Sequence, residues 1–150
     1  MIGTVASKRD IRKLSQDELK EFFTQHGEKP FRATQVYEWL WMKSAKDFDQ
    51  MTNVSLETRE LLKEHFSINS IKVDSMQRSA DGTIKNAVKL YDGLIVESVL
   101  IPHEKRITAC VSSQVGCSLD CKFCATARLK RMRNLSADEI YDQVVVIKEQ

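Results

Sequence analysis

The stretch CSLDCKFC, residues 117–124, places Cys117, Cys121 and Cys124 at spacings of four and three residues. Cys110 lies seven residues before the first of them, so all four cysteines of the 150-residue chain fall within fifteen positions. A secreted disulfide scaffold distributes its cysteines along the chain, because they tie distant loops together. The local cluster therefore indicates a metal or redox site.

Three of these thiols have the spacing of ligands on a single loop. A four-iron cluster normally takes four thiolates, so a three-cysteine loop leaves one iron open to a ligand that the protein does not supply. A structural zinc site with Cys110 as the fourth ligand is one alternative, and simple burial of the cysteines is another. Zinc sites of this kind favour two pairs of cysteines at short spacing, which this arrangement lacks. A redox sensor is a third alternative, and it requires a disulfide that cycles without any cluster.

The residues before the cysteines alternate with a period of two, as in strands. Ile71–Val73, Ile84–Leu90 and Leu94–Ile101 are separated by turns at Asp81-Gly82 and Asp92-Gly93. Such turns join antiparallel neighbours, so the pattern predicts an antiparallel meander. The third segment is apolar on both faces, which predicts a buried strand.

A strand and a helix flank the cysteine loop. Ile107–Val111 alternates again and leads into the loop, which predicts a further strand. Ser136 and Glu139 form a capping box, which opens a helix after the loop. The apolar stripe of this helix is predicted at Ile140, Val144 and Ile147.

The first seventy residues have helical periodicity. Ser15 and Glu18 form a capping box before an apolar stripe, which predicts the first helix. Further helices are predicted from about residue 33 to 41 and from about residue 55 to 66. The aromatic residues that we expect in the core of this region are Phe31, Trp39 and Trp41.

Composition and net charge do not identify the molecule that this protein binds. Hydrophobic residues make up 42% of the chain and charged residues 29%, which is typical of a globular protein. No apolar run could span a membrane, which predicts a cytoplasmic protein. The net charge of +2 is too small to indicate RNA by itself, so the position of the charge matters. Beside the cysteines, five basic residues could make phosphate contacts to RNA, and a solvated basic face is the alternative: Lys122, Arg128, Lys130, Arg131 and Arg133. A second basic group lies at the N-terminus, where a charged tail is expected: Lys8, Arg9, Arg12 and Lys13.

The CxxxCxxC spacing between a strand and a helix resembles the signature of the radical S-adenosylmethionine (SAM) superfamily. More narrowly, the chain resembles the RlmN family of RNA adenine-C2 methyltransferases. The similar segments are CVSSQVGC at 110–117, FCAT at 123–126, RNL at 133–135, GEKPFRATQV at 27–36, DFDQMTN at 47–53 and VESVLIP at 96–102. The resemblance covers nearly the whole chain. The sister Cfr family, which methylates carbon 8 of the same base, is the alternative within this group.

The resemblance implies a role for each cysteine and for one acidic residue. Cys117, Cys121 and Cys124 would hold a [4Fe-4S] cluster whose open iron binds SAM, and reduction would cleave SAM to a 5′-deoxyadenosyl radical. Glu97 would accept the proton that helps to release methylated adenine. Cys110 would be the resolving cysteine, which forms a transient disulfide with a methyl-carrying cysteine that has no match in this chain.

Two of these roles have structural alternatives. The apolar neighbours of Glu97 predict a desolvated carboxylate, a setting that favours a base, whereas the alternative is a strand-edge carboxylate that reaches solvent. For Cys110 the alternative is a small buried hydrophobic side chain.

We therefore expect an α+β fold in three parts. Residues 1–70 form a helical accessory domain that binds RNA, residues 71–105 an antiparallel meander, and residues 106–150 the first β/α unit of a radical SAM partial (β/α)6 barrel. A barrel of this type needs about six strand-helix units, so we expect this chain to be inactive alone and the segment from Ile107 onward to lack sheet partners. The resemblance also implies 23S rRNA and tRNA as substrates, an electron donor such as flavodoxin, and a monomeric complete enzyme.

Alanine substitutions separate the three-ligand arrangement from a four-ligand one. Cys117→Ala, Cys121→Ala and Cys124→Ala should each abolish the iron absorbance of the anaerobically purified protein, because these three lie on one loop with ligand spacing. Cys110→Ala should retain that absorbance. If Cys110→Ala loses it as completely as Cys124→Ala does, the three-ligand arrangement is wrong.

Overall fold

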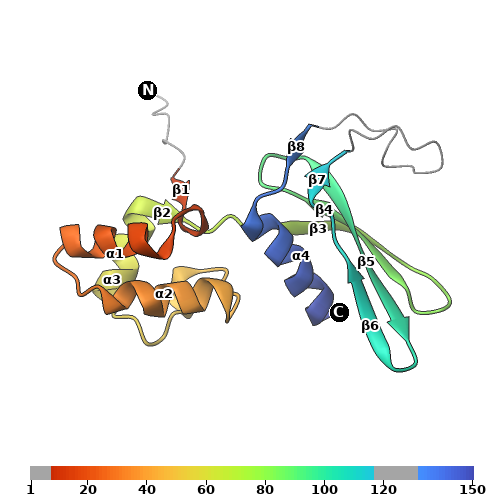
Figure 1. Ribbon diagram of the computed structural model, residues 1–150, viewed down its shortest axis with the longest axis horizontal. Coiled ribbons are helices and arrows are strands. Elements are labelled where there is room, and N and C mark those ends of the chain that lie inside the picture. The colour runs from red at the N-terminus through yellow and green to blue at the C-terminus, as the bar shows by residue number, and fades with distance from the viewer. Residues whose placement is uncertain (1–7, 117–131) are drawn as a thin grey trace. The chain divides into compact units, whose positions relative to one another are not determined.

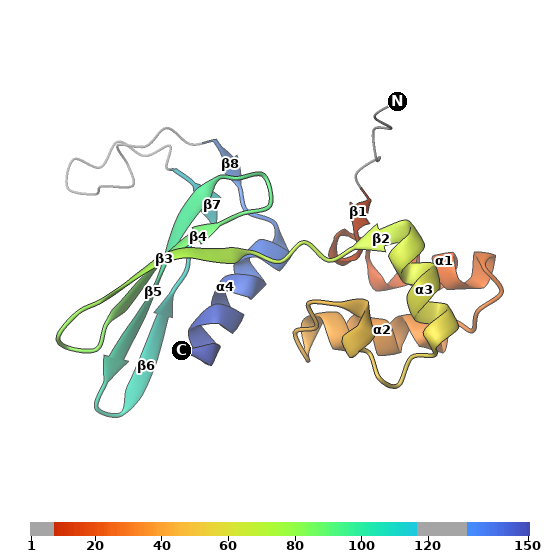
Figure 2. The ribbon, with the colours of Figure 1, turned by 180° about the vertical axis from the view of Figure 1, so that it is seen from behind.

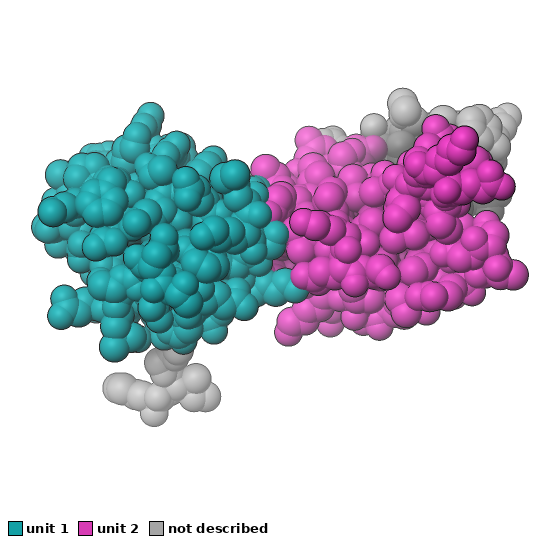
Figure 3. Space-filling view, turned by 90° about the horizontal axis from the view of Figure 1, so that it is seen from below, with its two compact units in different colours: residues 1–69 teal, residues 70–150 magenta. Residues whose placement is uncertain are grey.

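The computed structural model describes residues 8–116 and 132–150 of the chain. The chain divides between Asn69 and Ser70 into two compact units (Figure 3). Unit 1, residues 1–69, is mainly helical, whereas unit 2, residues 70–150, is built on an antiparallel sheet (Figure 1). The change of hydrophobic period in the sequence coincides with this division. None of the described helices is both long and apolar enough to cross a bilayer.

Unit 1, over residues 8–69, combines helices with a short parallel ladder. The elements are β1 (Arg9–Asp10), η1 (Ile11–Lys13), α1 (Gln16–Gln25), α2 (Phe31–Trp41), η2 (Phe48–Gln50), α3 (Leu56–His65) and β2 (Phe66–Ser67). The predicted capping box is confirmed, since the backbone N–H of Glu18 donates to Ser15 Oγ at 3.2 Å. In return, the backbone N–H of Ser15 donates to the Glu18 carboxylate at 2.7 Å. The pairing of β1 with β2 joins the two ends of the unit.

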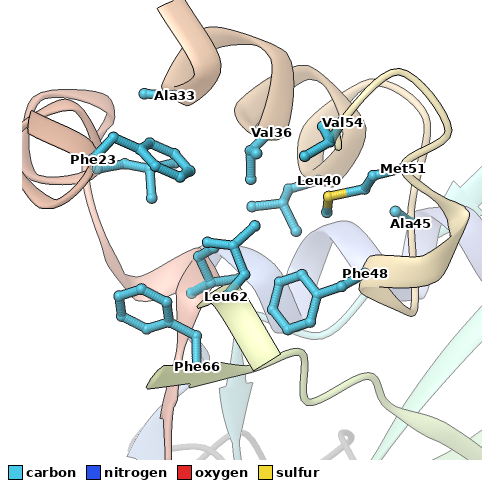
Figure 4. Close-up of a cluster of buried hydrophobic side chains, with 12 residues drawn as sticks. Phe23, Ala33, Val36, Leu40, Ala45, Phe48, Met51, Val54, Leu62 and Phe66 are labelled. Atoms are coloured by element: carbon cyan, nitrogen blue, oxygen red, sulfur yellow. The ribbon is translucent and has the colours of Figure 1, made fainter. Parts of the chain in front are cut away.

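The core of unit 1 lies where its helices meet. Phe23 of α1, Leu40 of α2 and Leu62 of α3 are almost completely buried. Figure 4 shows these side chains gathered with those of the η2 region, such as Phe48 and Met51. Removal of this apolar surface from water is the main source of stability for the unit.

Two of the three aromatic residues expected in this core pack against it. Trp39 and Trp41 are partly buried, and Trp39 Nε1 also donates to Asn53 Oδ1 at 2.6 Å. Phe31 is 49% exposed, so the prediction of a core position is wrong for this residue. It is the first residue of α2, and the guanidinium of Arg32 lies 4.8 Å from the centre of its ring.

Unit 2 is built on an antiparallel sheet whose neighbouring strands follow one another in sequence. The strands are β3 (Lys72–Arg78), β4 (Ile84–Lys89), β5 (Ile95–His103) and β6 (Arg106–Cys110). The predicted meander and both of its turns are confirmed. Gly82 and Gly93 at these turns have φ values of +87° and +88°, which glycine adopts without strain.

Within the described residues, β6 is an edge strand of this antiparallel sheet, and the start of a barrel in this region stays a prediction. It pairs antiparallel with β5, from His103 opposite Arg106 to Val99 opposite Cys110. The prediction that the segment from Ile107 onward lacks sheet partners is therefore wrong for this strand. A two-residue turn is enough to join antiparallel neighbours, whereas a parallel barrel strand would need a long crossover.

The helix α4 (Ala137–Glu149) covers one face of the sheet, as both ribbon views show (Figures 1 and 2). Ile84, Val96 and Leu100 are buried on this inner face. Ile147 of α4 packs in one cluster with Ile84 and Leu100. The inner face is therefore the core side of unit 2.

Alternate residues of β4 and β5 point the other way and form the outer face of the sheet. The outer face carries Lys85, Ala87 and Lys89 from β4, and Ile95, Glu97, Val99 and Ile101 from β5. Ile95 is 49% exposed and Ile101 is 42% exposed. The prediction that this strand is buried on both faces is therefore wrong. Within the described part of unit 2, α4 is the only helix, and it lies on the inner face.

Candidate functional site

Most residues predicted for the iron-sulfur site lie outside the described residues. They are Cys117, Cys121 and Cys124, together with the basic residues Lys122, Arg128, Lys130 and Arg131. Among residues 8–116 and 132–150, no group of three or more His, Cys, Asp or Glu side chains is placed to hold a metal ion. The cysteine ligand set therefore stays a prediction from the sequence.

The backbone on either side of the cysteine segment forms a short ladder. β7 (Gln114–Val115) pairs antiparallel with β8 (Arg133–Asn134). At the edges of this ladder, the Met132 N–H donates to the Val115 carbonyl, and the Leu135 N–H donates to the Ser113 carbonyl, each at 2.9 Å. The residues that enter and leave the cysteine segment are thus held side by side (Figure 1).

Arg133 connects this ladder to two other parts of unit 2. Its Nε donates to Asp92 Oδ2, in the turn between β4 and β5, at 2.8 Å. Its Nη1 and Nη2 donate to the two carboxylate oxygens of Glu139, in the first turn of α4, at 2.8 Å each. Such a two-point arginine–carboxylate contact fixes orientation as well as distance. The guanidinium is therefore paired with two carboxylates, and the phosphate contact expected from the sequence stays a prediction.

The ionisation of these three side chains is strongly coupled. Burial opposes the charge of Glu139, but hydrogen bonds from Arg133 and Ser136 outweigh it and lower its pKa to about 2. Hydrogen bonds to Glu139 and Asp92 raise the pKa of Arg133, and the bond from Arg133 lowers the pKa of Asp92. Because the folded pKa of Glu139 is depressed, its contribution to stability is present above the ordinary carboxyl pKa and is lost as the pH falls toward about 2.

The buried side chain of Gln143 holds the backbone at the end of β6. Its Oε1 accepts a hydrogen bond from the Ser112 N–H at 2.8 Å, and its Nε2 donates to the Ser112 carbonyl at 2.9 Å. The Nε2 also donates to the Glu139 carbonyl of α4 at 3.3 Å. Gln143 is fully buried, so its amide depends on these partners for its hydrogen bonds. The hydroxyl of Ser112 donates in turn to the Glu97 carbonyl at 2.6 Å.

The two predicted catalytic side chains lie on the same face of the sheet. Cys110 is opposite Val99, and Glu97 lies two residues before Val99 on β5. Side chains alternate along a strand, so Glu97, Val99 and Cys110 all point to the outer face. The sequence predicted no such relation, because it assigned these residues to different domains.

The predicted desolvation of Glu97 is wrong. Its side chain is 56% exposed, and its carboxylate lies 2.8 Å from the Lys85 ammonium on the neighbouring strand. Its apolar neighbours Ile95 and Ile101 are themselves exposed, so they do not exclude water. Glu97 thus corresponds to the alternative from the sequence, a carboxylate that reaches solvent.

Cys110 is a free, exposed cysteine. The alternative of a small buried hydrophobic side chain is therefore wrong. Its thiol is accessible from the outer face, which a role in thiol exchange requires.

The N-terminal basic group is not a uniform charged tail. Arg12 is buried, its Nη2 donates to the Asn69 carbonyl at 2.9 Å, and its Nε lies 3.6 Å from the Asp10 carboxylate. Arg12 is therefore part of the packing of unit 1.

Sequence reasoning missed Gln143, Lys85 and Asp92. Gln143 follows Glu139 by four positions, and a polar residue at that spacing in a helix can be buried on the same face. The sequence pattern predicted Val144 on the apolar face of this helix, but Val144 is 46% exposed, whereas Gln143 is fully buried. For Lys85 and Asp92 the sequence holds no signal, because both contacts depend on strand register and on the path of the chain.

Comparisons with known proteins identify the family. Residues 9–68 match the family described as "Ribosomal RNA large subunit methyltransferase N-terminal domain". A "Probable dual-specificity RNA methyltransferase RlmN" from Christiangramia forsetii is 68% identical over 145 residues, which is 97% of this chain and 41% of that protein. The chain belongs to the RlmN family. A relative of the same description from Flavobacterium psychrophilum is 70% identical over 140 residues, 93% of this chain and 40% of the relative.

A solved structure has the same fold over nearly all of this RlmN-family chain. It is a radical SAM methyltransferase from Sphaerobacter thermophilus, with a TM-score of 0.79 and 34% sequence identity. The match covers 94% of this chain and 42% of that one. The chain thus spans about two fifths of the length of the RlmN relatives and of the solved structure that it matches.

Removal of the Gln143 amide should loosen the backbone that precedes the cysteine segment. Gln143→Met keeps most of the volume but leaves the Ser112 N–H and carbonyl without this partner, which costs on the order of 1–3 kcal/mol. We expect faster hydrogen exchange in the 110–116 region of the full-length RlmN-family protein and a lower melting temperature. Gln77→Met, at an exposed position on β3, is the matched control and should change neither. Unchanged exchange at 110–116 in Gln143→Met would contradict this role.

Proposed function

We propose that this chain is the N-terminal part of a radical SAM enzyme that methylates carbon 2 of adenine in 23S rRNA and in tRNA. The observation that carries the proposal is the common orientation of Glu97 and Cys110 on the outer face, next to the ladder that holds the ends of the cysteine segment. Family membership supports the class of reaction, since the relatives are described as RlmN RNA methyltransferases. The choice of carbon 2 rests on the RlmN-type motifs around the cysteines.

The cysteine segment has the donor set for a [4Fe-4S] cluster. Cys117, Cys121 and Cys124 would bind three irons as thiolates and leave the fourth for SAM. When bound and reduced by a donor such as flavodoxin, the cluster supplies the electron that cleaves SAM. The described residues contribute rigidity on both sides of the segment, through the β7–β8 ladder and the contacts of Arg133.

Glu97 is the proposed proton acceptor in the release of methylated adenine. A carboxylate can accept a proton only when it is ionised. The carboxylate of Glu97 lies 2.8 Å from the Lys85 ammonium. Both side chains are about half exposed, so their ion pair contributes little to stability. We therefore assign Lys85 a positioning role, in which it directs the Glu97 carboxylate over the outer face.

Cys110 is the proposed resolving cysteine. In the covalent intermediate, a methylene group would join the adenine to the sulfur of the methyl-carrying cysteine. The exposed Cys110 thiolate would attack that sulfur, so that the S–S bond forms as the C–S bond breaks. The electron pair of the broken bond would leave on the methylene carbon, which takes a proton and becomes the methyl group of the product. Because β6 ends at Cys110 and Ser112 is held by Gln143, the position of this thiol is fixed relative to Glu97.

Unit 1 is proposed to contact the RNA substrate, and the residues after β6 are proposed to lead into the radical SAM barrel. The match of residues 9–68 to a domain described for ribosomal RNA methyltransferases supports the first assignment. The complete enzyme is proposed to act as a monomer in the cytoplasm.

Glu97→Gln in the full-length protein should separate radical formation from product release. The substitution removes a proton acceptor and no cluster or SAM ligand, so SAM cleavage should continue while RNA turnover falls by on the order of 10²-fold. Mass spectrometry of 5′-deoxyadenosine and of methyladenine measures the two steps. Glu104→Gln, which alters an exposed carboxylate at the β5–β6 turn, is the control and should resemble the wild type. Unchanged turnover in Glu97→Gln would remove this residue from the site.

A further inference from the structure

Two histidines lie side by side on the surface of unit 1, whereas the residues proposed for methyl transfer belong to unit 2. His26 directly follows α1, and His65 is the last residue of α3. Their ring centroids are 5.0 Å apart, and both residues are exposed. The ring of Phe22 contacts both, with centroid distances of 4.3 Å to His26 and 5.2 Å to His65. The fold therefore brings together two imidazoles from distant parts of the sequence.

The hydrogen bonds of these rings fix which nitrogen carries the proton. His26 Nδ1 lies 2.8 Å from the Phe22 carbonyl, and His65 Nδ1 lies 3.0 Å from the Leu61 carbonyl. A carbonyl oxygen can only accept, so Nδ1 is the donor in each neutral ring. The lone pair is then on Nε2 in both. Histidines that bind metals commonly have this arrangement, in which the other ring N–H donates to a backbone carbonyl.

The separation of the rings suits one shared metal ion. A transition metal binds an imidazole nitrogen at about 2.1 Å, so with tetrahedral angles two rings on one ion have centroids roughly 5 Å apart. The observed separation of 5.0 Å agrees with that value. The rings also lie at the C-terminal ends of two helices, where the helix dipoles favour a positive charge.

We propose that His26 and His65 bind one divalent transition metal ion, of the class of Ni²⁺, Cu²⁺ and Zn²⁺, through their Nε2 atoms. Neutral imidazole suits these ions, whereas Mg²⁺ and Ca²⁺ prefer oxygen ligands. Among the described residues, no third His, Cys, Asp or Glu completes a larger ligand group, so water fills the remaining positions. The ion would link the ends of α1 and α3 and stabilise unit 1 by mass action.

Calorimetric titration of Ni²⁺ into the full-length, cluster-loaded protein under anaerobic conditions tests this site. Loading with the cluster occupies the thiols of Cys117, Cys121 and Cys124, which would otherwise compete for the metal. Wild-type protein should bind one Ni²⁺, and His26→Gln and His65→Gln should each weaken that binding by roughly tenfold or more, because each removes half of the protein ligands. His103→Gln, at the remaining histidine of the chain and an exposed position on β5, is the matched control and should bind as the wild type does.

Three results would overturn the proposal. These are wild-type affinity in either single variant, an equal loss of binding in the His103→Gln control, and no binding by the wild type. Far-ultraviolet circular dichroism without metal shows whether each variant is folded, and a double variant of His26 and His65 should lose at least as much affinity as either single variant.

Discussion

The buried amide of Gln143 is the contact on which the arrangement of the proposed site depends. It satisfies both backbone groups of Ser112, at the point where the chain leaves β6 and approaches the cysteine segment. Ser112 then bonds to the Glu97 carbonyl, so one network joins α4 to the strands that carry Glu97 and Cys110. Gln143 is fully buried, so loss of these contacts would leave its amide without hydrogen-bond partners, which is costly. The network thus fixes the local geometry of the sheet, although the outer face of the sheet is exposed.

Ion pairing secures the other side of the cysteine segment. Arg133 joins the β7–β8 ladder to Asp92 and Glu139, and the depressed pKa of Glu139 shows that its charge is well compensated. The segment is therefore held at its base by backbone pairing, by an amide and by a guanidinium. Glu97 and Lys85 differ from these contacts, since they are exposed and contribute little to stability. We propose that their contact instead directs the Glu97 carboxylate over the outer face.

The sequence predicted the features that depend on local chemistry. The capping box at Ser15, the turns at Gly82 and Gly93 and the change of period near residue 70 were all readable, because each depends on a few neighbouring residues. Strand partners and burial were less predictable. Alternation shows that Ile107 lies on a strand but not which strand it joins, and apolar neighbours do not show that Glu97 is covered. The cysteine ligands were recognised from spacing and family resemblance alone.

The identity of the metal on the cysteine segment tests the central claim most directly. Iron, acid-labile sulfide and zinc can be measured in anaerobically purified full-length protein, together with its absorption spectrum. A brown, oxygen-sensitive protein with about four irons and four sulfides per chain is the predicted result. A colourless protein with tetrahedral zinc–sulfur coordination and no sulfide would contradict the proposed radical SAM chemistry.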